Sequence, residues 1–147
     1  MELKELYDKF ISDGCNRFYI EGIGGPQSDD VEVLGERNGL WEICYMERGQ
    51  KSSPLFSSSS KKEAIEFYTN HVFSIKHHHL AVITRSEQIM KKYKAMFVSN
   101  GVEFWQNDIP HYNKTNDRVY RLFVFGKDIF KIKELDKSLP LNNIQEI

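Results

Sequence analysis

An Asn-Gly pair between two strand-like segments is the feature that most constrains how this chain folds. Asn38 and Gly39 tolerate the positive φ angles that both central residues of a type I′ turn require. They separate residues 31–37 from residues 40–48, in which side chains alternate between two faces with period two. The sequence therefore predicts an antiparallel hairpin. On the second strand, one face carries Trp41, Ile43 and Tyr45, and the other carries Glu42, Cys44 and Met46. One of these faces should belong to the core, and Trp41 should be buried.

Helical periodicity predicts four helices beside this hairpin. The first is an apolar stripe with helical spacing that ends near Gly14. Ser60 with Glu63, and Thr84 with Glu87, form capping boxes, in which each end of the motif satisfies a backbone group of the other. The predicted helices span residues 3–12, 61–76, 86–99 and 128–135.

Further apolar segments predict additional strands. The continuous run from Leu122 to Phe125 is typical of a central strand covered on both faces. Residues 80–83 fit either a buried strand or a continued helix, and we favour the strand. The tail after Pro140 is expected to be loosely held. The other predicted strands span residues 17–23, an edge at 54–56, 102–105 and 118–125.

These segments together predict an α+β fold, with a mainly antiparallel sheet covered by three or four helices. The hairpin and the 118–125 strand are expected to belong to that sheet, and no repeat or linker interrupts the pattern. A chain of 147 residues with 13% aromatic residues can hold a core without disulfides. Residues 1–147 are therefore predicted to form one compact domain.

The sequence also predicts where in the cell the protein is located. No apolar run approaches the roughly 18 residues of a membrane helix, and the first residues alternate charge with apolar side chains instead of forming a secretion signal. Cys15 and Cys44 lack C-x-x-C spacing, so we interpret them as reduced thiols. We expect a cytoplasmic protein that does not bind membranes.

Charge is distributed unevenly along the chain. Residues 1–50 hold 11 acids and 5 bases, whereas residues 51–147 hold 10 acids and 15 bases. An acidic stretch of this kind repels nucleic acid and attracts a basic partner, although a solvated strand face is the simpler interpretation. Between Phe18 and Glu36 every charged residue is acidic, namely Glu21, Asp29, Asp30, Glu32 and Glu36.

Motifs for catalysis or cofactor binding are weak. Gly22 to Gly25 precede Pro26 and an acidic strand instead of the helix that a phosphate loop needs. His77 to His79 could hold a metal only with a further ligand from the fold, and a polar junction is the simpler interpretation. The positions of Glu42 and Glu47 differ by an odd number, so the two side chains do not pair on one strand face. We expect no catalytic residue, no metal and no cofactor.

Two further segments are candidate binding residues. Arg48 at the end of a strand is either a recognition arginine or a flanking charge at a turn. Residues 107–117 are long for a hairpin loop, and His111 and Tyr112 there belong to the mixture that interfaces enrich. A packed surface loop explains them equally well.

The sequence resembles bacterial immunity proteins of polymorphic toxin systems. The resemblance spans roughly residues 17–132 and includes a W-E strand, an E-R-G turn and a serine-rich step into Glu63-Ala64. The motifs in this chain are Val31-x-Val33-Leu34-x-x-Arg37-x-Gly39-x-Trp41-Glu42, Tyr45-x-Glu47-Arg48-Gly49, Asn107-Asp108-Ile109-Pro110 and Tyr120-Arg121-x-Phe123-Val124-Phe125-Gly126-x-Asp128-Ile129.

This resemblance implies a small cytoplasmic protein that binds and blocks a cognate toxin C-terminal domain, including toxins of contact-dependent growth inhibition. Many such toxins degrade nucleic acid, and a nuclease site must be basic, which the acidic stretch would complement. Neither nucleic acid nor a membrane is expected as a partner, and the sequence does not give the oligomeric state. The alternative hypothesis is a small nucleic-acid-processing or nucleotide-binding enzyme that uses the basic second half. The candidate partner-binding residues are Asp29, Asp30, Glu32, Glu36, Arg48, His111 and Tyr112.

Overall fold

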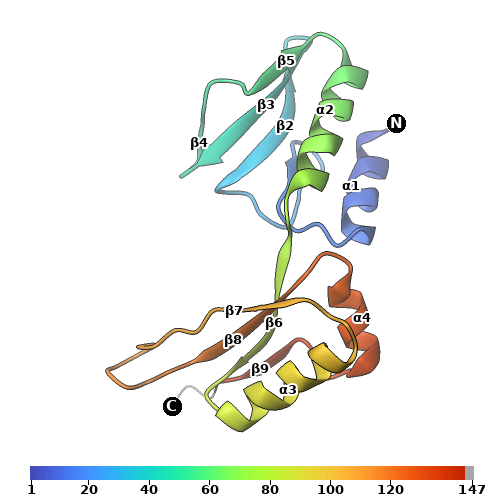
Figure 1. Ribbon diagram of the computed structural model, residues 1–147. Coiled ribbons are helices and arrows are strands. Elements are labelled where there is room, and N and C mark those ends of the chain that lie inside the picture. The colour runs from blue at the N-terminus through green and yellow to red at the C-terminus, as the bar shows by residue number, and fades with distance from the viewer. Residues whose placement is uncertain (145–147) are drawn as a thin grey trace. The chain divides into compact units, whose positions relative to one another are not determined.

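This computed structural model describes residues 1–144, which contain four helices and nine strands (Figure 1). The elements in chain order are α1 (Leu3–Ser12), β1 (Tyr19–Ile20), β2 (Val31–Arg37), β3 (Leu40–Glu47), β4 (Gln50–Lys51), β5 (Phe56–Ser58), α2 (Lys61–Ser74), β6 (His78–Thr84), α3 (Glu87–Ser99), β7 (Phe104–Gln106), β8 (Tyr120–Phe125), α4 (Asp128–Leu135) and β9 (Leu141–Asn143).

The chain divides into two compact units, and each has its own sheet and hydrophobic cluster. Unit 1 is Met1–His77 and unit 2 begins at His78. The α+β class, with four helices and mainly antiparallel pairing, is confirmed. The prediction that the hairpin and the 118–125 strand share one sheet is wrong, because the two sheets contain β1 to β5 and β6 to β9 respectively. A single domain over residues 1–147 stays a prediction.

The predicted hairpin organises the sheet of unit 1. β2 pairs antiparallel with β3 along its whole length, from Val31 opposite Met46 to Arg37 opposite Leu40. Asn38 and Gly39 have φ angles of 54° and 81°, so the type I′ turn is confirmed. β1 joins the other edge of β2 in parallel, and β4 and β5 both pair with β3.

Helices α1 and α2 cover one face of this sheet. Leu34 and Ile43 on the strands share a buried cluster with Phe10 of α1 and Tyr68 of α2. The Ser60 side chain accepts a hydrogen bond from the Glu63 backbone, which confirms the predicted cap of α2. Trp41 packs against the edge of the cluster and is only partly buried, which corrects the prediction that it is buried.

In unit 2, the sheet order is β7-β8-β6-β9, with α3 and α4 packed on one face. β8 lies between β7 and β6, so its predicted central position is confirmed. The expected cover on both faces is corrected, because α3 and α4 pack only on the face that carries Leu122 and Val124. Residues 80–83 lie within β6, which confirms a strand there. The last helix covers the predicted residues, Asp128–Leu135.

Two local predictions in unit 2 need correction. Ser86, and not Thr84, caps α3 by accepting from the Ile89 backbone, because Thr84 is the last residue of β6 and its hydroxyl accepts from the Ser86 backbone. The segment after Pro140 is not loosely held where the structure describes it. Leu141–Asn143 form β9, which pairs in parallel with β6, and Leu139 before it is buried.

Several predicted boundaries differ by a few residues. The strand predicted at residues 17–23 is the shorter β1, Tyr19–Ile20. The edge strand predicted at 54–56 is β5, Phe56–Ser58, and the strand predicted at 102–105 is β7, Phe104–Gln106. Helix α2 ends at Ser74, where the backbone of Ile75 becomes extended. Element ends depend on tertiary hydrogen bonds as well as on local propensity, so displacements of this size are expected.

Candidate functional site

The sheet of unit 1 has a second face, opposite the helices. Strand alternation turns Val33 on β2 and Cys44 on β3 toward this face, which we call the outer face. Val33 and Cys44 are directly opposite each other, and the next pair toward the hairpin turn is Gly35 with Glu42. The outer face thus presents a mixture of apolar and charged groups.

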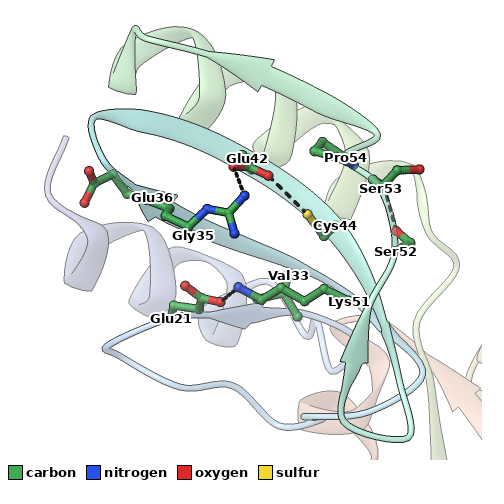
Figure 2. A pocket seen from close by; sticks show the side chains of 11 residues that line it. Glu21, Val33, Gly35, Glu36, Glu42, Cys44, Lys51, Ser52, Ser53 and Pro54 are labelled. Carbon is green, nitrogen blue, oxygen red and sulfur yellow. Dashed lines mark hydrogen bonds and ion pairs between the residues drawn. The ribbon is translucent and has the colours of Figure 1, made fainter.

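A cavity of about 310 Å³ opens on the outer face (Figure 2). Its wall on one side is the segment that follows β4, held to β3 where the Ser52 backbone N–H donates to Tyr45 O at 2.8 Å and the Leu55 backbone N–H donates to Ile43 O at 2.7 Å. Concave sites of this size suit a small ligand or a single side chain of a partner. The cavity is lined by Glu21, Val33, Gly35, Glu36, Arg37, Glu42, Cys44, Lys51, Ser52, Ser53 and Pro54.

Two ion pairs cross this cavity. Lys51 on β4 contacts the Glu21 carboxylate, and the Glu21 backbone N–H donates to Leu34 O at 2.9 Å, which fixes that residue beside β2. Arg37 at the hairpin turn lies with its guanidinium nitrogen 3.6 Å from the Glu42 carboxylate. Figure 2 shows Lys51 extending toward the Glu21 carboxylate, and Glu42 lying near Cys44.

Gly35 makes room for one of these carboxylates. A Cβ at position 35 would collide with the carboxylate of Glu21. The absence of a side chain at this strand position therefore lets Glu21 lie across the sheet.

Cys44 lies beside Glu42, with 3.8 Å between its sulfur and the carboxylate oxygen. Burial raises the pKa of the Cys44 thiol above its ordinary value, and the negative charge of Glu42 raises it further. The thiol is therefore protonated at neutral pH and is a weak donor to Glu42 rather than an activated nucleophile.

The structure brings three of the predicted partner-binding residues to one end of the hairpin. Asp30 pairs with Arg17 at 3.8 Å, and Asp29 accepts from the Gly49 backbone at 3.4 Å, next to Arg48. Asp29, Asp30 and Arg48 are all exposed. They form a charged group near the β3-β4 turn.

Glu36 and Glu32 lie elsewhere on β2. Glu36 is exposed at the opposite end of the hairpin, where its carboxylate accepts from the Gly39 backbone at 2.6 Å, and it lines the cavity. Glu32 points to the helix face, where its carboxylate lies 3.5 Å from His71 of α2 and is only 19% exposed. Glu32 therefore does not belong to one exposed acidic surface with the other three acids.

His111 and Tyr112 belong to unit 2. The Tyr112 ring lies 5.3 Å from the guanidinium of Arg85, which also pairs with Asp117 at 3.0 Å. That arginine hydrogen bond lowers the pKa of the Asp117 carboxyl. His111 is exposed and its Nδ1 accepts from the Asn116 backbone. These contacts explain how the 107–117 loop is ordered, and its role in binding stays a prediction.

The three consecutive histidines have different surroundings. His77 is buried, its Nδ1 accepting from the backbones of Asn16 and Arg17 and its Nε2 donating to Val72 O. His78 instead contacts the rings of Trp105 and Phe123 in unit 2. Within residues 1–144, no three His, Cys, Asp or Glu side chains are grouped so that they could hold a metal ion.

Of the residues that line the cavity, sequence reasoning selected only Glu36 as a candidate binding residue. Strand alternation did predict that Glu42 and Cys44 lie on the same face of their strand. Glu21 and Lys51 arrive through tertiary pairing, which no local pattern reports.

We compared this chain with protein-family models, with curated proteins and with solved structures, and none of them matches it. Over residues 1–144, no helix combines the length and the apolar composition that crossing a membrane requires.

Proposed function

We propose that this chain is an immunity protein that binds and neutralises the C-terminal domain of a cognate bacterial toxin in the cytoplasm. The observation that carries the proposal is the outer face of unit 1, where a concave site contains the carboxylates of Glu21 and Glu42. Unit 1 as a whole holds 13 acids and 9 bases, a net charge of −4. The proposed activity is occlusion of the toxin's active site or substrate surface, without catalysis by this chain.

The charge of unit 1 favours a basic partner. A toxin that cleaves nucleic acid needs a positive surface to hold phosphates. An acidic inhibitor is attracted to such a surface over about a Debye length, which speeds association and makes it depend on salt. A concave site adds a place for a side-chain anchor, and such anchors slow dissociation.

The first test uses the toxin domain encoded next to this chain, which we expect at the end of a large secreted protein. The two purified proteins should form a stoichiometric complex, and the complex should lack the toxin's activity. Co-expression should also protect growing cells from the toxin. A toxin that remains fully active with excess inhibitor would refute the proposal.

The second test asks whether the exposed acids steer association. Reversing Asp29, Asp30 and Glu36 to lysine should slow association at low salt by roughly tenfold or more, because long-range attraction becomes repulsion. Glu32 is left unchanged, since its carboxylate is largely buried against His71. Stopped-flow association at several salt concentrations measures the effect.

A matched control reverses three exposed acids of unit 2 by the same charge. This variant carries Glu87→Lys, Glu103→Lys and Glu134→Lys. It should associate much faster than the unit-1 variant. Equal slowing in both variants would show that net charge alone matters, and the interpretation that the exposed acids of unit 1 steer association would be wrong.

The alternative, a small nucleic-acid-processing or nucleotide-binding enzyme, rests on unit 2. That unit holds 11 bases and 8 acids, and Trp105 is 43% exposed on the sheet face opposite α3 and α4. Its ring lies 5.1 Å from that of Phe123, and exposed aromatic side chains on a sheet can stack with bases. Turnover of nucleic acid or nucleotide by the purified chain, lost on Trp105→Ala, would favour this alternative.

A further inference from the structure

The Glu42 carboxylate is the least compensated charged group of the cavity. Its side chain is only 14% exposed, so little water reaches it. The two donors that the structure places beside it are both distant, with Arg37 at 3.6 Å and the Cys44 thiol at 3.8 Å. A well-made hydrogen bond to a carboxylate is about 2.7–2.9 Å long, and a buried carboxylate without such bonds is costly. The site therefore favours a closer cation.

Arg37 is a partner that can be displaced. Its side chain is 80% exposed and comes from the end of β2 at the hairpin turn. An exposed arginine that makes one long contact gains little, because it loses side-chain entropy and stays in water. A cation delivered into the cavity can exchange with it at small cost.

The remaining groups of the cavity define the shape and charge of that cation. Val33 and Gly35 form part of the sheet surface beneath it, while Glu21 provides a further carboxylate. Glu21 already holds Lys51, so Glu42 is the carboxylate available for exchange. A guanidinium is planar and presents parallel N–H donors that match a carboxylate, whereas an ammonium is a compact point charge.

We propose that this cavity takes the guanidinium of an arginine side chain presented by the bound protein, which replaces Arg37 at Glu42. The proposal rests on the proposed function, because it names the group by which the toxin is anchored. A peptide-bound arginine fits better than free arginine, because free arginine also carries an α-ammonium and an α-carboxylate, two strongly hydrated charges that would lose water on entering the cavity.

The direct test uses a small probe and needs no toxin. N-acetyl-arginine methylamide, titrated at low salt, should shift the NMR amide signals of Gly35 and Cys44 with a roughly millimolar dissociation constant. The matching lysine compound and free arginine should each bind at least threefold more weakly. A lysine compound that binds equally well would overturn the guanidinium assignment. Free arginine that binds equally well would overturn the assignment to a protein partner.

Two variants of opposite effect make this test specific. Glu42→Gln keeps the shape and removes the charge, so the arginine probe should bind at least tenfold more weakly. Arg37→Ala removes the internal competitor, so the probe should bind about twofold or more tightly. The control is Glu47→Gln, an exposed position on the same strand, which should leave binding unchanged. Amide spectra of each variant establish that it is folded.

No saturable shift in the wild-type protein, or a Glu42→Gln variant that binds the probe normally, would overturn the proposal. The toxin complex supplies a second measure, and Glu42→Gln should weaken it by thirtyfold or more, as for truncation of a buried charge pair. A complex of unchanged affinity would overturn this inference and leave the proposed function standing. Probe binding without any toxin complex would refute the proposed function instead.

Discussion

Removal of a single hydroxyl, in Tyr68→Phe, tests how helix α2 is fixed to the sheet of unit 1. Tyr68 is fully buried. Its oxygen accepts from the Tyr19 backbone N–H at 3.0 Å and lies 2.6 Å from Glu32 O, to which it donates. One side chain thus joins α2 to both β1 and β2. Phenylalanine preserves the ring and its edge contact with Phe10.

The expected cost follows from these two partners. Without the hydroxyl, a backbone donor on β1 and a backbone acceptor on β2 lose their hydrogen bond beside a fully buried side chain. Each unsatisfied buried group costs about 1–3 kcal/mol, so the variant should be less stable by about 2–4 kcal/mol. Tyr7→Phe is the control, because Tyr7 packs through its ring at the edge of the same cluster and should change stability by no more than about 0.5 kcal/mol.

Urea denaturation measures both variants. The chain has two tryptophans, Trp41 in unit 1 and Trp105 in unit 2, so a Trp105→Phe background makes Trp41 emission a reporter of unit 1. A loss below about 1 kcal/mol, or an equal loss in Tyr7→Phe, would refute the assignment of these bonds as the main link between α2 and the sheet.

The pH dependence provides an independent check on Tyr68. Burial raises the pKa of Tyr68 above its ordinary value of 10.0. Above pH 10 the unfolded chain therefore ionises this residue while the folded chain does not, and stability falls as pH rises toward the folded pKa. Tyr68→Phe should show a weaker alkaline loss of stability in the same urea experiment.

Three further predictions concern other groups. Trp41→Ala should destabilise unit 1 by about 1–3 kcal/mol in urea denaturation followed by circular dichroism, because the side chain is only partly buried; no change would contradict its packing on the cluster. Gly35→Ala should push the Glu21 carboxylate away, at a cost below about 1 kcal/mol, and NMR should show the Lys51 side chain released; unchanged Lys51 signals would count against the close approach. The Ser138 hydroxyl lowers the pKa of Asp136, so unit 2 should lose stability as pH falls from 3.8 through that lowered pKa, and Ser138→Ala, followed by Trp105 emission, should reduce this acid sensitivity.

Local patterns predicted the local structure well. The Asn38-Gly39 turn, strand 31–37 and helix 128–135 each depend on a few neighbouring residues, and all three lie where the sequence placed them. The cap of α3 was misplaced because Thr84 with Glu87 matches the capping-box pattern, although Ser86 is the residue that caps the helix. Only the end of β6 decides between them.

Non-local pairing could not be predicted in the same way. Alternation says that a segment is a strand but not which strand it joins, so one sheet was predicted where there are two. Glu32 shows a signal that was available but not used. It shares parity with Leu34 on β2, which places both on the helix face, yet it was grouped with exposed acids by charge alone.

The candidate site, like the fold, was predictable only where it depends on local sequence. Glu42 and Cys44 were assigned to a common face by strand parity, and this is confirmed by their contact. The cavity exists because the segment after β4 folds back along β3 and because Glu21 arrives from the end of β1. Both events join residues that are distant in sequence, which periodicity does not encode.

The three residues of β9 have a practical consequence for handling this protein. They occupy the edge of β6 through pairs from Val82 with Leu141 to Thr84 with Asn143. Without them, the N–H and C=O groups along that edge would be open to any extended chain, and unprotected edges promote aggregation. A truncation before Leu139 should therefore yield a protein that self-associates, whereas a purification tag attached beyond Asn143 preserves the natural cover of the edge.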